Sequence, residues 1–291
     1  MAVFKVKNNY WFFEGFVAGD LSEIEIATKI KKIIYSGKSP FQEINVYDTY
    51  TYGKVLVLDE VIQAAEKDEF IYHEALCQPC LFLHQNPKKV LIIGGGDGGA
   101  LRQALMHKIE EACLVEIDSK VIEVCKKYLP SIHGKSFEDK RSKIIIEDGK
   151  QYIKKKKDYF DIIILDLSDP AGPAEDLVSL SFYRQVKRAL KKNGIISVQA
   201  GSFTYQPKLV ENIFKRLKKT FSYLETRKAV VPSFQDGQYS FILASDKKLS
   251  RISINEIEKK YKKMKLNLNY YYPAMHFASK VLPYYLKTKY N

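Results

Sequence analysis

This sequence of 291 residues has little of what marks several large classes of protein. Its four cysteines are too few for a disulfide-stapled domain, and its 15 glycines and 10 prolines exclude a collagenous or low-complexity chain. No apolar run approaches the roughly 20 residues that a membrane-spanning helix needs. With 46% hydrophobic residues, the chain instead has enough apolar side chains for a sizeable buried core.

The cationic side chains are uneven in kind and in placement. Of the 47 Lys and Arg residues only 7 are Arg, and against 34 acids they give a net charge of +13. Residues 247–291 alone hold 11 Lys or Arg against Glu256 and Glu258. Clustered cations are the electrostatic footprint of phosphate binding, so nucleic-acid binding is the first hypothesis to test.

The N-terminal residues and the cysteines bear on the cellular compartment. The first 30 residues lack a cationic start followed by an apolar stretch and a cleavage site, so we expect no secretory signal and a cytoplasmic protein. Cys77 and Cys80 have the spacing of half a zinc site, but no second pair matches it, and we expect no metal. We expect both to be small buried residues on an apolar helix, with a disulfide between them left open.

The periodicity of the apolar residues changes at Pro87. Before it, residues 43–63 alternate and are broken at 52–54, which predicts antiparallel strands and a turn, and residues 68–84 have helical spacing. After it, short apolar runs alternate with amphipathic stretches. These runs lie at residues 90–94, 112–118, 143–148, 160–166 and 194–200.

Short apolar strands alternating with helices are typical of a doubly wound α/β sheet, parallel in its centre and covered on both faces. Two later apolar runs, SYLETR and YSFILAS, could complete this sheet in antiparallel fashion. We therefore expect a small antiparallel β domain over residues 1–66 and an α/β domain over residues 67–291. The second domain includes the basic C-terminal extension at residues 247–291.

A glycine-rich segment joins the first strand of the α/β domain to its helix. Gly94, Gly96 and Gly99 satisfy G-x-G-x-x-G, a spacing that lets the backbone turn tightly and approach a ligand at a helix N-terminus. The motif alone is a weak signal. It gains weight because Glu116 ends the next strand, where a carboxylate can accept hydrogen bonds from both ribose hydroxyls.

Further acids stand at the ends of the following strands. Asp148 ends the third strand and Asp166 the fourth, and strand carboxyl ends line the ligand crevice of a doubly wound sheet. We therefore predict that these two acids converge on one crevice with Glu116 and with Asp97 of the glycine segment. A simpler interpretation is that each acid caps the helix after it, which suits any one of them better than all four.

Asp97 constrains the kind of ligand. Inside the glycine segment this acid would repel a pyrophosphate, so it favours a cationic ligand such as a sulfonium nucleoside of the adenosylmethionine type. A nucleic-acid methyltransferase is then one candidate. Such amino-methylating enzymes place an Asn/Asp-Pro-Pro-aromatic loop after the fourth strand, whereas residues 166–173 read DLSDPAGP. The two carboxylates of that segment, Asp166 and Asp169, would favour a cationic acceptor.

Over nearly its whole length the chain resembles the spermidine synthase family of polyamine aminopropyltransferases. The motifs that carry the resemblance are FQ at 41–42, YGKVLVLD at 52–59, VIQ at 61–63, DEFIYHE at 68–74, GGGDGG at 94–99, VEID at 115–118, DG at 148–149, DLSDPAGP at 166–173 and QA at 199–200. The resemblance implies a Rossmann-like domain of the adenosylmethionine-methyltransferase type. It also implies aminopropyl transfer from decarboxylated S-adenosylmethionine, a co-substrate, to putrescine or a related amine, without a cofactor. The products would be spermidine, or a longer polyamine, and methylthioadenosine.

The resemblance also implies roles for individual residues. Asp166 matches the catalytic proton acceptor, and Tyr72 could hydrogen-bond the attacking nitrogen. The residues expected to bind the donor or methylthioadenosine are Gln42, Gly94, Gly95, Gly96, Asp97, Glu116, Asp148, Gly149 and Pro173. The residues expected to contact the acceptor are Gln63, His73, Asp97, Asp169, Gln238 and Tyr239.

The chain departs from the family pattern at residues 231–239, where many spermidine synthases have a Trp-containing segment. The Pro-Ser-Phe-x-Asp portion and the extended C-terminal residues look more like the thermospermine-forming branch. Acceptor length therefore stays open between putrescine, cadaverine, agmatine and spermidine.

The family is usually dimeric or tetrameric, which implies a homodimer or homotetramer acting on small amines, with no nucleic acid or membrane as partner. The basic excess is then a Lys-rich exterior around an acidic pocket. Two alternatives remain. One is an S-adenosylmethionine-dependent methyltransferase acting on nucleic acid or a small amine, and the other is a non-catalytic nucleoside- or polyamine-binding protein.

Overall fold

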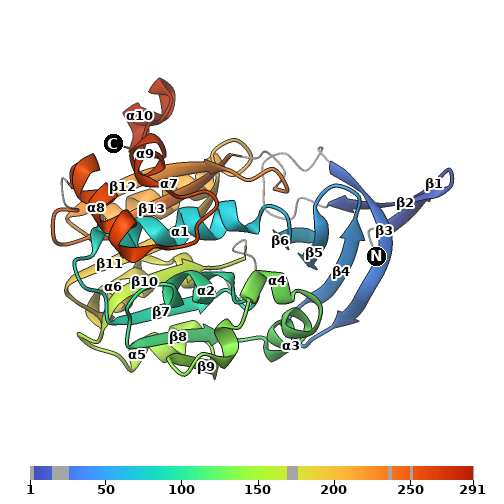
Figure 1. Ribbon diagram of the computed structural model, residues 1–291, viewed down its shortest axis with the longest axis horizontal. Helices are drawn as coiled ribbons and strands as arrows, with labels where there is room; N and C mark the ends of the chain where they lie inside the picture. The colour runs from blue at the N-terminus through green and yellow to red at the C-terminus, as the bar shows by residue number, and fades with distance from the viewer. Residues whose placement is uncertain (1–2, 15–25, 169–175, 235–237, 250–251, 291) are drawn as a thin grey trace.

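Two sheets organise the chain, and helix α1 (Glu69–Leu83) follows the first and leads into the second (Figure 1). The computed structural model describes residues 3–14, 26–168, 176–234, 238–249 and 252–290. Within these ranges the first sheet has six strands in chain order, and the second has seven.

The first sheet is antiparallel throughout. Its strands are β1 (Val3–Val6), β2 (Asn9–Glu14), β3 (Ile26–Lys38), β4 (Glu43–Thr49), β5 (Gly53–Leu58) and β6 (Val61–Ala65). The antiparallel strands and the turn predicted within residues 43–63 are confirmed. Alternating residues serve two cores, since Leu56 packs toward helix α3 (Ser119–Tyr128) while Val55 and Val57 pack on the opposite face.

The second sheet is doubly wound, as predicted. Its strands are β7 (Lys89–Gly94), β8 (Glu111–Glu116), β9 (Ser142–Ile146), β10 (Phe160–Asp166), β11 (Leu190–Ser202), β12 (Tyr223–Val230) and β13 (Gln238–Ser245). They lie in the order β12-β13-β11-β10-β7-β8-β9, in which β7 to β11 pair in parallel and β12 and β13 complete the sheet antiparallel.

Helices cover both faces of this second sheet. Leu91 and Ile93 pack on α5 (Gly149–Lys154), α6 (Leu180–Ala189) and α7 (Pro207–Lys218), whereas Val90 and Ile92 pack on α1 and α2 (Gly99–Leu105). Because neither face of the central strands meets water, β7, β8 and β10 each contain an unbroken buried apolar run, at residues 90–93, 112–115 and 162–165. The short helices α4 (Pro130–His133) and η1 (Ser136–Glu138) lie between α3 and β9. Among the residues described, no helix is long and apolar enough to cross a membrane.

Cys77 and Cys80 lie on α1 as buried free thiols. Their predicted place as small core residues on an apolar helix is confirmed, and no disulfide joins them. They pack in the core between α1 and the second sheet together with Leu76 and Leu81. The Cys-x-x-Cys spacing here serves packing.

The basic C-terminal residues pack on the α/β domain and form the helices α8 (Ile254–Met264), α9 (Pro273–Ala278) and α10 (Tyr284–Tyr290) (Figure 1). The carboxylate of Glu74 on α1 accepts three backbone N–H groups from residues 269–271, at 2.7 to 2.9 Å. Arg227 of β12 is buried and donates to the carbonyl oxygen of His276 at 2.6 Å. Lysines such as Lys262 and Lys289 stay exposed, so this segment contributes charge to the exterior and apolar contacts to the core.

Candidate active site

A cavity of about 380 Å³ lies at the carboxyl ends of the parallel strands. Its centre is the point where β7 pairs with β8 on one side and with β10 on the other, the switch point at which doubly wound sheets bind ligands. Both sheets contribute walls. Of the predicted site residues, the cavity is lined by Gln42, Gln63, Tyr72, Gly94, Gly95, Gly96, Asp97, Glu116, Asp148, Gly149, Asp166 and Tyr239.

Some predicted site residues do not line the cavity. His73 lies behind Asp97 because consecutive residues of a helix point about 100° apart, so His73 and Tyr72 face different directions. Gln238 begins β13 next to Tyr239 but is not part of the lining. Asp169 and Pro173 lie outside the described residues.

The glycine segment brings the ends of β7 and β10 together. Gly94 has a φ of 81°, and a Cβ at this position would overlap the carbonyl oxygen of Asp166. The backbone N–H of Gly95 donates to the same carbonyl oxygen at 2.9 Å. The close approach of the ends of β7 and β10, which only glycine permits, places Asp97 and Asp166 on one cavity.

Asp166 is buried, with one carboxylate oxygen partnered and one unpartnered. Oδ1 accepts a hydrogen bond from the Tyr72 hydroxyl at 2.6 Å, whereas Oδ2 has no partner among the described residues. Burial raises the pKa of Asp166 to about 6, with Asp97 adding to the effect and His73 opposing it. Burial and Asp166 also raise the pKa of Tyr72 well above its ordinary value, so its hydroxyl stays protonated. Asp166 can therefore accept a proton near neutral pH.

Glu116 and Asp148 occupy the neighbouring strand ends. Glu116 accepts the backbone N–H of Asp118 at 2.9 Å, and burial raises the pKa of Glu116 to about 7. Asp148 caps α5 by accepting the N–H of Lys150 at 2.7 Å and still lines the cavity. An acid such as Asp148 can both cap a helix and line the cavity, because the helix that follows a strand begins at the same edge of the sheet as the cavity.

Asp118 is a site-shaping residue that the sequence reasoning missed. Its Oδ2 accepts hydrogen bonds from the Gln42 side-chain amide at 2.9 Å and from the Ser39 hydroxyl at 2.7 Å. These bonds tie the first sheet to the start of α3 and aim Gln42 at the cavity. The VEID motif contains this second acid, two residues after Glu116, and could have drawn attention to it.

Phe234 lies in the segment 231–239 that departs from the family pattern, but it was not among the predicted site residues. It lines the cavity with its ring centroid 4.7 Å from that of Tyr239 and 5.4 Å from that of Tyr72. Asp68 fixes the preceding residue, accepting the backbone N–H and the hydroxyl of Ser233 at 2.7 and 2.8 Å. Three aromatic rings therefore form one wall next to Asp166.

The fold and the site define a class, a Rossmann-like domain whose acid-lined cavity suits a cationic small molecule. Residues 69–256 match the model of the spermine/spermidine synthase domain. Residues 10–66 match the model of the spermidine synthase tetramerisation domain. The two matches together cover the whole second sheet and, from Tyr10 onward, strands β2 to β6 of the first.

Individual relatives agree with these matches. The chain is 45% identical over 230 residues to polyamine aminopropyltransferase 1 of Aquifex aeolicus, covering 79% of this chain and 82% of that one. It is 36% identical over 271 residues to the polyamine aminopropyltransferase of Clostridium tetani, covering 92% and 94%. A crystal structure of spermidine synthase in complex with the transition-state analogue AdoDATO gives a TM-score of 0.90 at 36% identity, covering 96% and 94%. The chain belongs to the spermidine synthase family, and the predicted family and fold class are confirmed.

Proposed function

We propose that this protein transfers the aminopropyl group of decarboxylated S-adenosylmethionine to putrescine or a related di- or polyamine. The products are spermidine, or a longer polyamine, and methylthioadenosine. The observation that carries the proposal is Asp166, whose Oδ2 is buried and unpartnered among the described residues while Tyr72 holds Oδ1. Family membership and the relative solved with AdoDATO support the same reaction. The donor acts as a co-substrate, so the scheme needs neither a cofactor nor a metal.

The difficulty of this reaction lies with the attacking amine. Its nitrogen forms a bond to the carbon next to the sulfonium, the carbon–sulfur bond breaks, and the electron pair returns to sulfur. The thioether therefore leaves neutral and needs no acid. An alkylammonium like that of lysine has a pKa of about 10.4, so the nitrogen must lose a proton before it attacks. Asp166 accepts that proton at Oδ2, helped by burial, which lowers the pKa of the amine and raises that of the carboxyl.

The remaining lining residues position the two substrates. In this proposal Asp97 binds the ammonium of the aminopropyl group, Glu116 the ribose hydroxyls, and Asp148 the edge of the adenine; that all three line one cavity supports these roles. In the same proposal Gln63 and Tyr239, which line the cavity and of which Tyr239 belongs to the aromatic wall, contact the acceptor. Orienting two reactants in this way can lower the activation barrier by roughly 7 to 11 kcal/mol, which is more than proton transfer alone supplies.

We further propose a cytoplasmic homodimer or homotetramer. Residues 10–66 match a tetramerisation domain, and the first sheet, to which they belong, exposes large apolar side chains, among them Phe4 at 57% and Tyr10 at 52%. Exposed apolar surface of this kind is typical of subunit contacts. The free thiols of Cys77 and Cys80 support a reducing compartment.

One experiment tests the proposed function against its alternatives. The purified protein is mixed with decarboxylated or intact S-adenosylmethionine and, in turn, with putrescine, cadaverine, agmatine or spermidine, and the products are separated by chromatography. We expect methylthioadenosine and an elongated amine from the decarboxylated donor only. A methylated product from the intact donor would indicate a methyltransferase. Binding of donor and amine without methylthioadenosine from any pair would indicate a non-catalytic binding protein and contradict the proposal.

A further inference from the structure

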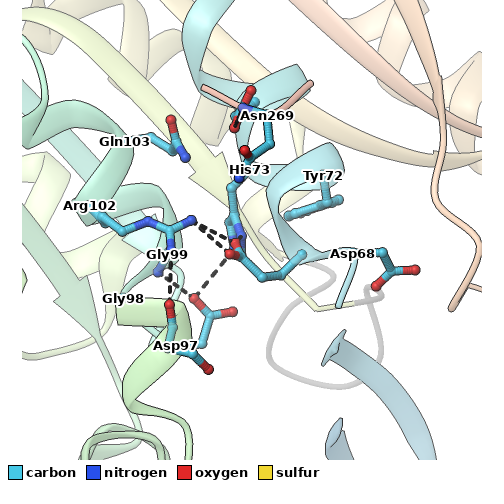
Figure 2. A network of polar contacts seen from close by, with 12 residues as sticks. Asp68, Tyr72, His73, Asp97, Gly98, Gly99, Arg102, Gln103 and Asn269 are labelled. Atoms are coloured by element: carbon cyan, nitrogen blue, oxygen red, sulfur yellow. Dashed lines mark hydrogen bonds and ion pairs between the residues drawn. The ribbon is translucent and has the colours of Figure 1, made fainter. Parts of the chain in front are cut away.

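Arg102, Glu69, His73 and Asp97 form a network of polar contacts, which we call the buried ion chain; Arg102, His73 and Asp97 are labelled in Figure 2. Arg102 of α2 donates to both carboxylate oxygens of Glu69, at 2.8 and 2.9 Å. Oε2 of Glu69 lies 2.7 Å from Nδ1 of His73, and Nε2 of His73 lies 3.4 Å from Oδ1 of Asp97. Positive and negative groups therefore alternate from Arg102 to Asp97, and only the last of them lines the cavity.

Three members of the buried ion chain, Glu69, His73 and Asp97, are shielded from solvent, whereas Arg102 is partly exposed. His73 is 1% exposed and Asp97 8% exposed. The imidazole packs so tightly on Gly99 that a Cβ there would overlap the ring. The N–H of Gly99 also donates to Oδ1 of Asp97 at 2.7 Å. The last glycine of the loop motif thus makes room for the histidine and holds the aspartate, which fixes the two side chains relative to each other.

The surroundings of His73 favour its charged form. Burial disfavours an imidazolium, but Asp97 and Glu69 outweigh it and raise the pKa of His73 well above its ordinary value. Burial would likewise raise the pKa of Asp97, yet His73 and the Gly99 N–H hold it below its ordinary value. The titratable groups around the imidazole are Glu69 and Tyr72 from α1, Asp97 from the glycine segment and Asp166 from the end of β10, and Arg102 from α2 is paired with Glu69.

We propose that His73, oriented by Glu69 and Arg102, is a positioning residue that keeps Asp97 ionised and aimed at the ammonium end of the donor. The inference rests on the proposed function, because it takes the aminopropyl ammonium as the partner of Asp97. It replaces the expected contact between His73 and the acceptor with a role exerted through Asp97. Arg102 offsets the charge of Glu69, so that this carboxylate orients the imidazole without adding an unpaired buried anion.

The test uses two ligands that differ at the ammonium group. Decarboxylated S-adenosylmethionine carries the aminopropyl chain, whereas methylthioadenosine has a methyl group in its place. For His73→Gln we expect the affinity for the donor to fall about tenfold or more, and that for methylthioadenosine to stay within about twofold, in calorimetric titrations. Equal losses for the two ligands, or no loss for either, would overturn the positioning role.

The pH dependence of kcat/KM is a second test, because replacing a residue that only fills space would not change it. The charge on His73 lowers the pKa of Asp166, so its removal should shift the acidic limb of kcat/KM to higher pH. An unchanged limb in His73→Gln would contradict this. Glu123→Gln is the matched control, because Glu123 forms an exposed ion pair with Lys120 at 2.9 Å, outside the buried ion chain. It should alter neither the ligand ratio nor the profile.

A second variant keeps the test decisive if His73→Gln does not fold. Glu69→Gln keeps the shape of the side chain and the imidazole but removes one of the two carboxylates that hold it. We expect the same selective loss of donor affinity, smaller in size. If the wild-type protein releases no methylthioadenosine with any amine, the proposed function fails. If the wild type reacts and both variants keep its ratio of donor to methylthioadenosine affinity, the positioning role alone fails.

Discussion

The glycine segment and the end of β10 each bring a buried aspartate to the same cavity, yet the two carboxyl groups differ in charge behaviour. Asp97 faces the imidazolium of His73 and accepts an N–H, and its pKa lies below the ordinary value. Asp166 is hydrogen-bonded by a tyrosine hydroxyl, and burial raises its pKa to about 6. The direct pairing with His73, which Asp97 has and Asp166 lacks, therefore separates a carboxylate that stays ionised from one that can accept a proton.

The largest effect is expected at the end of β10. In Asp166→Asn, turnover should fall on the order of 10²- to 10⁴-fold, because the proposed proton acceptor is lost. Affinity for methylthioadenosine should not change, and the melting temperature should not fall, since the variant no longer carries a buried ionised carboxylate. Steady-state kinetics, calorimetry and thermal melting measure the three quantities. Near-wild-type turnover would remove Asp166 from this role.

The next largest effect is expected at the glycine segment. In Asp97→Asn, the KM for the donor should rise roughly 10- to 100-fold, since a neutral amide replaces the anion proposed to bind the ammonium. Turnover at saturating donor should change less. Kinetics at varied donor concentration separate the two parameters. A collapse of turnover with an unchanged KM would mean that the two aspartates have the opposite roles.

A smaller effect is expected from the tyrosine that partners Asp166. Activity of the wild type should rise with pH through about 6, as Asp166 loses its proton. The hydrogen bond from Tyr72 lowers the pKa of Asp166, so Tyr72→Phe should move this limb to higher pH and reduce kcat/KM about tenfold at neutral pH. The pH dependence of kcat/KM for both proteins is the measurement. A limb that does not move would show that Tyr72 does not tune the base.

The smallest catalytic effect is expected from a third buried carboxylate, which lies on α1 away from the cavity. Glu74 binds three backbone N–H groups of the C-terminal residues. Glu74→Gln should therefore lower the free energy of unfolding by about 1 to 3 kcal/mol and leave kcat and KM unchanged. Denaturant titration and steady-state kinetics measure this. A loss of activity without a loss of stability would show that the C-terminal residues reach the site.

The convergence of the acids was predictable from sequence, because apolar periodicity locates the strand ends and parallel strands share one edge. The direction of His73 was not. Tyr72 and His73 stand side by side in one motif, and only the packing of α1 against the glycine segment decides which of them faces the cavity. Phe234 was missed because its contact with Tyr72 joins residues far apart in the chain.

The contacts of the C-terminal residues were also not predictable from local sequence patterns. Composition described their charge correctly as a feature of the exterior. It could not show that Glu74 would bind the backbone at residues 269–271, or that Arg227 would be buried against His276, because neither contact leaves a local signal. Long-range polar contacts of this kind depend on the finished fold.

The exposed lysines at the C-terminus set the conditions under which a polycationic acceptor meets this protein. At long range the acceptor approaches a molecule of net charge +13 and is repelled, and it is attracted only close to the cavity. Dissolved salt screens charges separated by more than about 8 to 10 Å, so it weakens the repulsion before it weakens the attraction. The association of the acceptor with the protein should therefore become faster as ionic strength rises from low values. An acidic site alone would give the reverse.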